Sequence, residues 1–391
     1  MRLSLLTLTL LSCARMSASL SAAAIRPAGV AANMKAAAAS IRAGKLVAFP
    51  TETVYGLGAS VFDPAAVQSV FAAKQRPASD PLIVHVLDWE QAVSVLALPS
   101  AALRDAMAAL AEEFWPGPLT MVAPAAASVP LSVTAGTGLV GVRSPDHAVA
   151  RALIAEAQVP IVAPSANRFG HVSPTTAQHV YDDLAHADGL TILDGGASCR
   201  HGIESTVCRV DLDASPPRLV VFRRGAVPPS ALLDALRRAG IADIEACIEK
   251  KHAKPAAAAA AGTAVSPGFA APGQLLTHYS PDVPTFLAGV GDGDGAPGAD
   301  APLAATVVVD FGGALATLQG GCLAYRDLSP DASPQDAGAA LFATLRWTES
   351  VEGAKRVVLA DVTAGGARED EAILAVADRM FRAASGRRVA V

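Results

Sequence analysis

Between residue 31 and about residue 243, apolar and polar positions form short blocks that alternate between helical and extended patterns. Helical spacing of apolar residues occurs in MKAAAASIRAG, AAVQSVFAAK, SPDHAVARALIAEAQ and SPTTAQHVYDDLAHA. Blocks that are brief, β-branched and bounded by Gly, Pro or Asp predict strands. These are KLVAFPT, PLIVHVL, LTMVAP, LVGVRSP, VPIVAPSA, LTILDGG, STVCRVD and RLVVFRRG. Helices interspersed among strands predict an α/β domain with a twisted mixed sheet and flanking helices.

The pattern changes after residue 245. Residues 250–268, KKHAKPAAAAAAGTAVSPG, read as a low-complexity linker, and the FAAPGQLLTHYSPDVP that follows is too specific in composition for a spacer. ATVVVDFGG, GCLAYRDLS and AKRVVLADV predict strands alternating with two helices. We therefore expect a large domain over 31–245, a linker over 246–284 and a smaller α/β domain, Rossmann-like in character, over 285–391.

The N-terminus contains no acidic residue before Glu52, while three arginines lie among Ser, Ala and Leu. This composition suits an organelle transit peptide, or a secretory apolar segment followed by one; the alternative is a disordered Ala-rich leader. The run Leu3–Leu11 is too short to span a membrane. We assign residues 1–30 to this leader. We expect a cytoplasmic protein, or one of the mitochondrial or plastid matrix if the leader is a transit peptide.

Charge and cysteine usage exclude several classes. The formal net charge of −5 argues against a protein that coats nucleic acid, so any anion site must be local. The five cysteines form no C-x-x-C pair and have no zinc-ligand spacing, so we expect them to be reduced. There is no Walker A loop, no G-x-G-x-x-G opening a helix and no G-x-S-x-G. The candidate sites contain many cations and hydroxyls and few general bases, which favours phosphoryl or nucleotidyl chemistry.

A basic pair stands out at Lys74 and Arg76. In the preceding helix, Val67, Val70 and Lys74 share one face by helical spacing, so Lys74 should point the way the apolar face points. Pro77 bars continuation of the helix, which places both cations at the mouth of the next strand. The functional interpretation is a site for a polyanion such as nucleotide phosphates. The alternative is that the pair complements the helix C-terminal dipole.

Other polar residues cluster at predicted strand ends. Thr51, Thr53 and Tyr55 precede glycines in what we interpret as a Gly-rich turn, where the backbone could approach a ligand; the alternative is simple turn formation. Ser165 and Asn167 follow the strand VPIVAP, where ligands bind in open α/β sheets, although capping would also explain them.

Arginines near strand ends form a further set. Arg143, Arg223 and Arg224 lie there together with Ser205, and their convergence on one pocket would indicate recognition of a carboxylate or phosphate. Spacing alone does not establish that convergence. His85, in IVHV, is most simply a strand residue.

With these residues identified, the chain resembles the threonylcarbamoyl-AMP synthase family, whose catalytic part is the YrdC-like domain. The resemblance covers about residues 33–245. The motifs that carry it are PTETVYGLG, KQRPASDPL, WPGPLT, VGVRSPDH, PSAN, SPTTAQHV, ESTV and FRRGAV, in family order. APGQLLTHYSP and the smaller unit resemble the long form of the family, which has an additional C-terminal domain.

The resemblance implies that L-threonine, bicarbonate or CO2, and ATP give threonylcarbamoyl-AMP and pyrophosphate. The product would pass to the machinery that makes threonylcarbamoyladenosine in tRNA, with possible RNA contact and no membrane role. ATP would bring Mg2+, no dedicated carboxylate cage is visible, and no tightly bound cofactor is expected. The alternatives are carbamoyl transfer in hydrogenase maturation and a non-catalytic RNA-binding module of the same fold. Retention of Lys74, Arg76, Ser165 and Asn167 favours the synthase.

The resemblance also implies roles for individual residues. Lys74 and Arg76 would be catalytic and would contact the nucleotide. Arg224 stands where relatives often carry another residue, so Arg223 is the safer assignment for the nucleotide. His278 and Tyr279 would belong to a lid over the site, or would act as a structural wedge. The threonine and carbamate pocket would be lined by Thr51, Thr53, Tyr55, His85, Thr120, Arg143 and Ser205. The nucleotide would further contact Ser165, Asn167, Val172 and Arg223.

Overall fold

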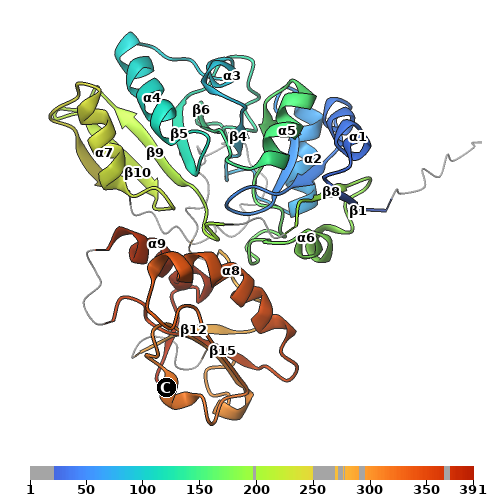
Figure 1. Ribbon diagram of the computed structural model, residues 1–391, viewed down its shortest axis with the longest axis vertical. Coiled ribbons are helices and arrows are strands. Elements are labelled where there is room, and N and C mark those ends of the chain that lie inside the picture. Colours follow the sequence, from blue (N-terminus) through green and yellow to red (C-terminus); the bar gives the residue numbers. More distant parts are fainter. Residues whose placement is uncertain are drawn as a thin grey trace, which may run out of the picture.

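The computed structural model describes residues 22–196, 200–249, 269–271, 276, 278–289, 296–364 and 370–391. Two sheets organise the described chain: one of eleven strands and one of five. Figure 1 shows them as an upper body, blue to yellow, and a lower body, orange to red. Residues 1–21 of the predicted leader and the predicted low-complexity linker at 250–268 lie outside the described residues.

The large sheet is mixed, as the sequence predicts. Its order is β1-β8-β2-β3-β7-β4-β6-β5-β9-β10-β11. β4 and β6 run parallel, whereas β5 and β6 run antiparallel. The strands are β1 (Ala24–Pro27), β2 (Val47–Phe49), β3 (Gly56–Ser60), β4 (Ile83–His85), β5 (Leu119–Pro124), β6 (Leu139–Arg143), β7 (Ile161–Val162), β8 (Thr191–Asp194), β9 (Thr206–Asp211), β10 (Arg218–Arg223) and β11 (Glu245–Ile248).

Helices pack against this sheet. They are α1 (Ala31–Arg42), α2 (Pro64–Lys74), α3 (Trp89–Val93), α4 (Ala101–Phe114), α5 (Ala148–Ala157), α6 (Ala177–Leu184) and α7 (Pro229–Arg238). The start of α2 is fixed by the Asp63 carboxylate, which accepts from the backbone N–H groups of Ala65 and Ala66 at 2.9 and 3.1 Å. Gln75 adopts a left-handed conformation and ends the helix, so Lys74 occupies its last turn.

Two local expectations need correction. Ala24–Pro27, placed in the leader, forms β1 and pairs in parallel with β8, so the fold begins before residue 30. The predicted Gly-rich turn after Phe49 is partly a strand, β3, which lies between β2 and β7. A Cβ at Gly58 would lie 2.7 Å from the Phe49 ring and 2.9 Å from Ile161 Cγ2. Glycine is therefore present because the strand is crowded, and not to form a turn.

The smaller sheet is entirely parallel in its strand pairs, with the order β14-β13-β15-β12-β16. Its strands are β12 (Thr285–Ala288), β13 (Thr306–Asp310), β14 (Ala324–Asp327), β15 (Arg356–Leu359) and β16 (Arg388–Val389), and its helices are α8 (Pro334–Ser350) and α9 (Glu371–Ala383). The second α/β unit predicted from the sequence is confirmed. Short 3-10 turns occur at Leu303–Ala305 and Ala316–Leu318.

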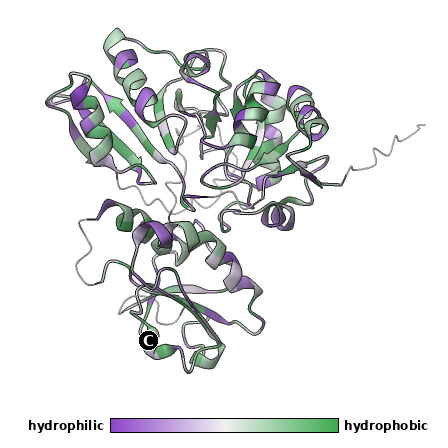
Figure 2. Ribbon diagram, in the orientation of Figure 1, coloured by the Kyte–Doolittle hydropathy of each residue, from purple (hydrophilic) through white to green (hydrophobic). Residues whose placement is uncertain are grey.

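The two bodies meet through α8 and α9, which lie on the side of the small sheet facing the large domain (Figure 1). One apolar cluster crosses the boundary: Val172 and Ile203 of the large domain pack with Leu341 and Phe342 of α8. The strands of both sheets are predominantly hydrophobic, while the helices mix hydrophobic and hydrophilic positions (Figure 2). Within the described ranges, no helix is both long and apolar enough to cross a membrane.

Candidate active site

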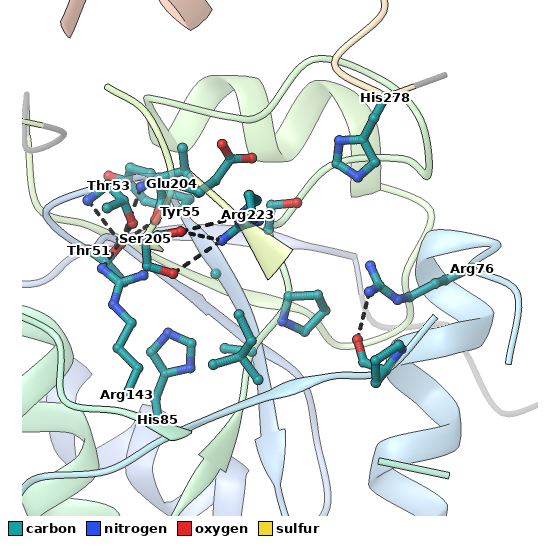
Figure 3. A pocket seen from close by; sticks show the side chains of 17 residues that line it. Thr51, Thr53, Tyr55, Arg76, His85, Arg143, Glu204, Ser205, Arg223 and His278 are labelled. Atoms are coloured by element: carbon teal, nitrogen blue, oxygen red, sulfur yellow. Dashed lines mark hydrogen bonds between the residues drawn. The ribbon is translucent and has the colours of Figure 1, made fainter. Parts of the chain in front are cut away.

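A pocket opens among several strand ends of the large sheet, with about 570 Å³ of empty space, part of it open to solvent (Figure 3). It collects side chains from the β2–β3 connection, from β4, β6 and β10, and from the segments that follow β7 and precede β9. The lining residues are Thr51, Thr53, Val54, Tyr55, Gly56, Arg76, Pro81, Ile83, His85, Arg143, Ala163, Pro164, Ser165, Glu204, Ser205, Arg223 and His278. The arginines that the sequence singled out at positions 76, 143 and 223 therefore converge.

One end of the pocket is built around Arg143. Its Nη2 lies 2.6 Å from a carboxylate oxygen of Glu52, and both side chains are buried. Arg143 also donates to the Thr53 hydroxyl at 3.0 Å, and the Thr51 and Thr53 hydroxyls are 2.9 Å apart. Burial alone would raise the pKa of Glu52, but the charge of Arg143 lowers it, so Glu52 is ionised. Arg143 and the two hydroxyls are thus fixed before any substrate arrives.

A second group joins Ser205 to Arg223. The Arg223 guanidinium donates to the Ser205 carbonyl through Nε and Nη2, at 3.1 and 3.0 Å, and to the Ser205 hydroxyl at 3.1 Å. Thr120 lies behind Ser205, with the two hydroxyl oxygens 2.7 Å apart. Thr120 is not a lining residue, and its role is to orient the Ser205 hydroxyl. These contacts hold the Arg223 side chain at the pocket wall.

Arg76 occupies the opposite side of the pocket in Figure 3. It forms a buried ion pair with Asp80, Nη2 to Oδ2, at 2.9 Å. It also donates to the carbonyls of Asp80 and Pro81 at 3.0 and 2.8 Å. Burial lowers the pKa of Arg76, and the nearby Arg223 charge lowers it further. Two buried guanidinium groups close enough to repel each other are suited to binding an anion between them.

Lys74 lies beneath the pocket and does not line it. Its side chain is buried, as the helical spacing predicts, but Nζ donates to the carbonyls of Ser165 and Asn167. Burial, followed by the charge of Arg76, brings the pKa of Lys74 well below its usual value. The two residues of the basic pair therefore have different positions. Arg76 faces the pocket, and Lys74 holds the segment that carries Ser165.

Asn167 and Val172 also lie away from the pocket. The Asn167 amide donates to the carbonyls of Arg168 and His171 at 2.8 Å each, which closes a turn. The Val172 carbonyl accepts from Arg346 of α8. Of the predicted site residues, those lining the pocket are Thr51, Thr53, Tyr55, Arg76, His85, Arg143, Ser165, Ser205, Arg223 and His278, and those outside it are Lys74, Thr120, Asn167, Val172 and Tyr279.

The two histidines of the pocket are neutral at physiological pH. Burial, and then the Arg143 charge, lower the pKa of His85 to about 3. Burial is also the main reason that the pKa of His278 falls to about 3. Neither imidazole adds positive charge to the pocket, and each can offer only neutral hydrogen bonding.

The predicted lid pair has two different environments. His278 lines the pocket opposite Arg143 (Figure 3), whereas Tyr279 is buried between the domains, its ring centroid 5.1 Å from that of Phe342. Tyr279 also has a positive φ of 62°, which a non-glycine residue adopts only when its surroundings enforce it. The Tyr279 ring packs as a wedge between the domains.

Two buried carboxylates near the pocket were not predicted from the sequence. Glu52 pairs with Arg143, and Glu204 pairs with Arg379 of α9, Oε2 to Nε, at 3.1 Å. Both lie inside motifs quoted above, PTETVYGLG and ESTV. An acidic residue within a segment that otherwise favours anion binding could have identified them as buried and paired. Glu204 lines the pocket and Glu52 lies behind its lining, and each is matched by an arginine, which leaves the pocket suited to anionic ligands.

Profile comparisons match both parts of the chain. A profile described as "Telomere recombination" (Sua5_yciO_yrdC) matches residues 39–225. A second profile, described as "Threonylcarbamoyl-AMP synthase, C-terminal domain", matches residues 240–385. Together the two profiles cover most strands of both sheets, with β1 and β16 outside the matched ranges.

Individual relatives agree with these profiles. The threonylcarbamoyl-AMP synthase of Pyrococcus abyssi is 43% identical over 256 residues, which are 65% of this chain and 67% of that protein. The threonylcarbamoyl-AMP synthase of Bacillus subtilis is 39% identical over 256 residues, covering 64% of this chain and 65% of that protein. The crystal structure of P. abyssi Sua5 complexed with L-threonine is similar with a TM-score of 0.72 and 32% identity, over 92% of this chain and 96% of that one.

Proposed function

Because the chain belongs to the threonylcarbamoyl-AMP synthase family, we propose that it converts L-threonine, bicarbonate or CO2, and ATP into threonylcarbamoyl-AMP and pyrophosphate. The observation that carries this proposal is the convergence of Arg76, Arg143 and Arg223 on one pocket whose lining carboxylate, Glu204, is already paired with Arg379. The solved relative that contains L-threonine supports the amino-acid substrate.

The amino acid would bind at the Arg143 end. Arg143 and the Ser205 hydroxyl offer N–H and O–H donors to the threonine carboxylate and to the carbamate oxygens. The Thr51 hydroxyl donates to the Val54 carbonyl at 2.6 Å, and with Thr53 it holds Arg143 in place. Because Glu52 compensates part of the Arg143 charge, this end would bind a single carboxylate more readily than a triphosphate. Tyr55 and neutral His85 complete its walls.

The nucleotide would bind toward Arg76 and Arg223, with Ser165 beside them. The threonine amine would first form an N–C bond to CO2 and lose a proton, giving a carbamate; starting from bicarbonate, water would leave instead. A carbamate oxygen would then attack the α-phosphorus, the bond from that phosphorus to the bridging oxygen would break, and pyrophosphate would leave. Both reactants are anions, so fixed cations remove the main barrier to their approach. Lys74 would contribute by fixing the Ser165 segment from below, rather than by direct contact with phosphate.

A divalent cation is implied by the use of ATP, but the described lining residues do not form a site for one. Glu204, which lines the pocket, and Glu52, which lies behind the lining, are each engaged by an arginine. Mg2+ would therefore arrive as part of the nucleotide substrate, held by phosphate oxygens. None of the residue roles given above depends on bound Mg2+.

The product would pass to the enzymes that transfer the threonylcarbamoyl group to tRNA. Its mixed carbamic–phosphoric anhydride is reactive toward water, which favours direct transfer to the next enzyme. We further propose a cytoplasmic location, or an organelle matrix if residues 1–30 act as a transit peptide; imaging of the full chain fused to a fluorescent protein at its C-terminus would distinguish these.

The test is direct. The purified protein is incubated with ATP, threonine and labelled bicarbonate, and pyrophosphate and a labelled adenylate are measured. We expect both to depend on threonine, and we expect Lys74→Ala to abolish turnover without unfolding the chain. Pyrophosphate release that does not need threonine would contradict the proposed activity, and full activity of Lys74→Ala would contradict the role of Lys74 in fixing the Ser165 segment.

A further inference from the structure

Glu204 occupies a position that should hinder an anion-binding site. It lines the pocket, is 5% exposed, and immediately precedes Ser205, on which Arg223 is held. A buried carboxylate repels phosphate groups nearby and attracts any neighbouring guanidinium. Left uncompensated, Glu204 would compete with both Ser205 and a nucleotide for Arg223.

The compensating charge comes from the other domain. Arg379 of α9 is fully buried, and its Nε lies 3.1 Å from Glu204 Oε2, although 175 residues separate the two in the chain. Through Nη1 it also donates to the Arg224 carbonyl, next to Arg223, and to the Ala375 carbonyl of its own helix at 3.2 Å. Asp378 of the same helix lies 3.5 Å from Nη1. Arg379 therefore contacts the segments on both sides of the Ser205–Arg223 contact.

The electrostatics agree with this geometry. Burial would raise the pKa of Glu204, but the charges of Arg379 first and Arg223 second lower it to about 2. Glu204 is thus ionised at any working pH, and Arg379 carries the larger share of its compensation. Arg223 retains its three contacts with Ser205 while Arg379 is in place.

We propose that Arg379 is a positioning residue for the nucleotide end of the pocket: by binding Glu204 from the C-terminal domain, it leaves Arg223 on Ser205 and available to ATP phosphates. This inference rests on the proposed function for the identity of the nucleotide. The C-terminal domain would then contribute to nucleotide binding, because the charge of Glu204 is compensated only when α9 is docked against the large domain.

Three variants of the full chain test this. Arg379→Met removes the charge and keeps most of the volume, and we expect the KM for ATP to rise by at least about tenfold, with threonine affinity within about twofold of wild type. Arg379→Lys should recover part of the loss. The double variant Arg379→Met/Glu204→Gln should return the KM for ATP to within about threefold of wild type, because the unpaired carboxylate is gone although the cross-domain ion pair stays broken.

The double variant separates positioning from mere stability. If Arg379 only holds the domains together, the double variant will be as impaired as the single one, and the inference is overturned. Glu349→Gln is the matched control, since Glu349 accepts from Asp282 and His171 across the same domain boundary but does not line the pocket. Its KM for ATP should stay within about twofold of wild type.

The pH dependence of ATP affinity provides a further test, because a purely structural role of Arg379 would not change it. In Arg379→Met, Glu204 faces only Arg223, His278 and Tyr279, so its protonation as the pH falls from 8 to 5.5 should improve ATP binding. Wild type should show no such improvement. ATP affinity is measured by calorimetry as well as by turnover, so a wild type that binds ATP but forms no adenylate contradicts the proposed function alone. Unchanged ATP affinity in Arg379→Met contradicts the positioning role alone.

Discussion

Arginines serve opposite purposes in the two domains. In the large domain, Arg76, Arg143 and Arg223 line the pocket and are held by groups of their own domain. In the small domain, Arg346 and Arg379 are equally buried, but they cross the boundary to Asp183 and Glu204. The first set keeps positive charge available to a ligand, whereas in the second set Arg379 compensates the pocket carboxylate Glu204 and Arg346 binds Asp183 at the domain boundary.

The strand ends of the two sheets carry different polar residues. In the large sheet they supply arginines and hydroxyls that face a pocket. In the small sheet, Asp310 at the end of β13 is fully buried and accepts from the backbone N–H groups of Phe311 and Leu315 and from the Tyr325 hydroxyl. Asp327 accepts from Gly312 and Gly313. The residues at the strand ends, and not the α/β class that the two sheets share, thus decide which sheet carries a charged pocket.

The largest expected effect comes from substituting one pocket arginine and one domain-boundary arginine by methionine. Arg143→Met strands the buried carboxylate of Glu52 and should lower the free energy of unfolding by about 3–5 kcal/mol, whereas Arg346→Met leaves Asp183 paired with His171 and should lower it by less. Only Arg143→Met should also lower the turnover of the folded fraction, by at least about a hundredfold. Chemical denaturation and pyrophosphate release measure the two effects. Equal losses of turnover would erase the distinction between pocket and interface arginines.

An intermediate effect is expected at the closest approach of the two backbones. Gly202 has φ +62°, and a Cβ there would lie 2.2 Å from the Gly338 carbonyl oxygen of α8. Gly202→Ala should therefore lower the midpoint of thermal unfolding by more than its conformation alone explains. Gly189→Ala is the control, since Gly189 has φ +63° and nothing within 4 Å of such a Cβ. We expect the control to cost about 1 kcal/mol and Gly202→Ala about 2–4 kcal/mol. Equal losses of stability in the two variants would mean that the contact between Gly202 and α8 relaxes at no cost in free energy.

The smallest expected effect is a pH dependence of the domain boundary. His171 lies 2.9 Å from Asp183 and 2.7 Å from Glu349 of α8. Burial alone would lower its pKa, but hydrogen bonds to these two carboxylates raise it overall, against a smaller opposing effect of Arg346. A raised histidine pKa stabilises the folded state below its unfolded value of about 6.5 and loses that contribution as the pH rises through the folded value.

The stability difference between wild type and His171→Gln should accordingly be largest near pH 6 and shrink toward pH 9. Urea unfolding at a series of pH values measures it. A difference that grows with pH would show that His171 contributes as a neutral hydrogen-bonding group.

Much of the site was readable from local sequence. Asp63 followed by Pro64 fixes the start of α2, and the spacing from Val67 correctly places Lys74 on the buried face. The helix start and its buried face depend on hydrogen bonds and periodicities within a few residues, which the order of amino acids specifies directly. The motifs around Arg143, Ser205 and Arg223 mark residues that line the pocket, but spacing alone did not establish that they meet there.

Other features depended on segments far apart in the chain. Whether Lys74 enters the pocket or binds the carbonyls of Ser165 and Asn167 depends on where the segment after β7 lies, about 90 residues on. The pairing of Glu204 with Arg379 likewise requires α9 to dock with one particular face toward β9 and β10. The sequence by itself determined which side chains are charged, capped or buried. Only the tertiary structure decided which charges meet, because an ion pair depends on distances of a few ångströms between elements whose relative positions no local pattern encodes.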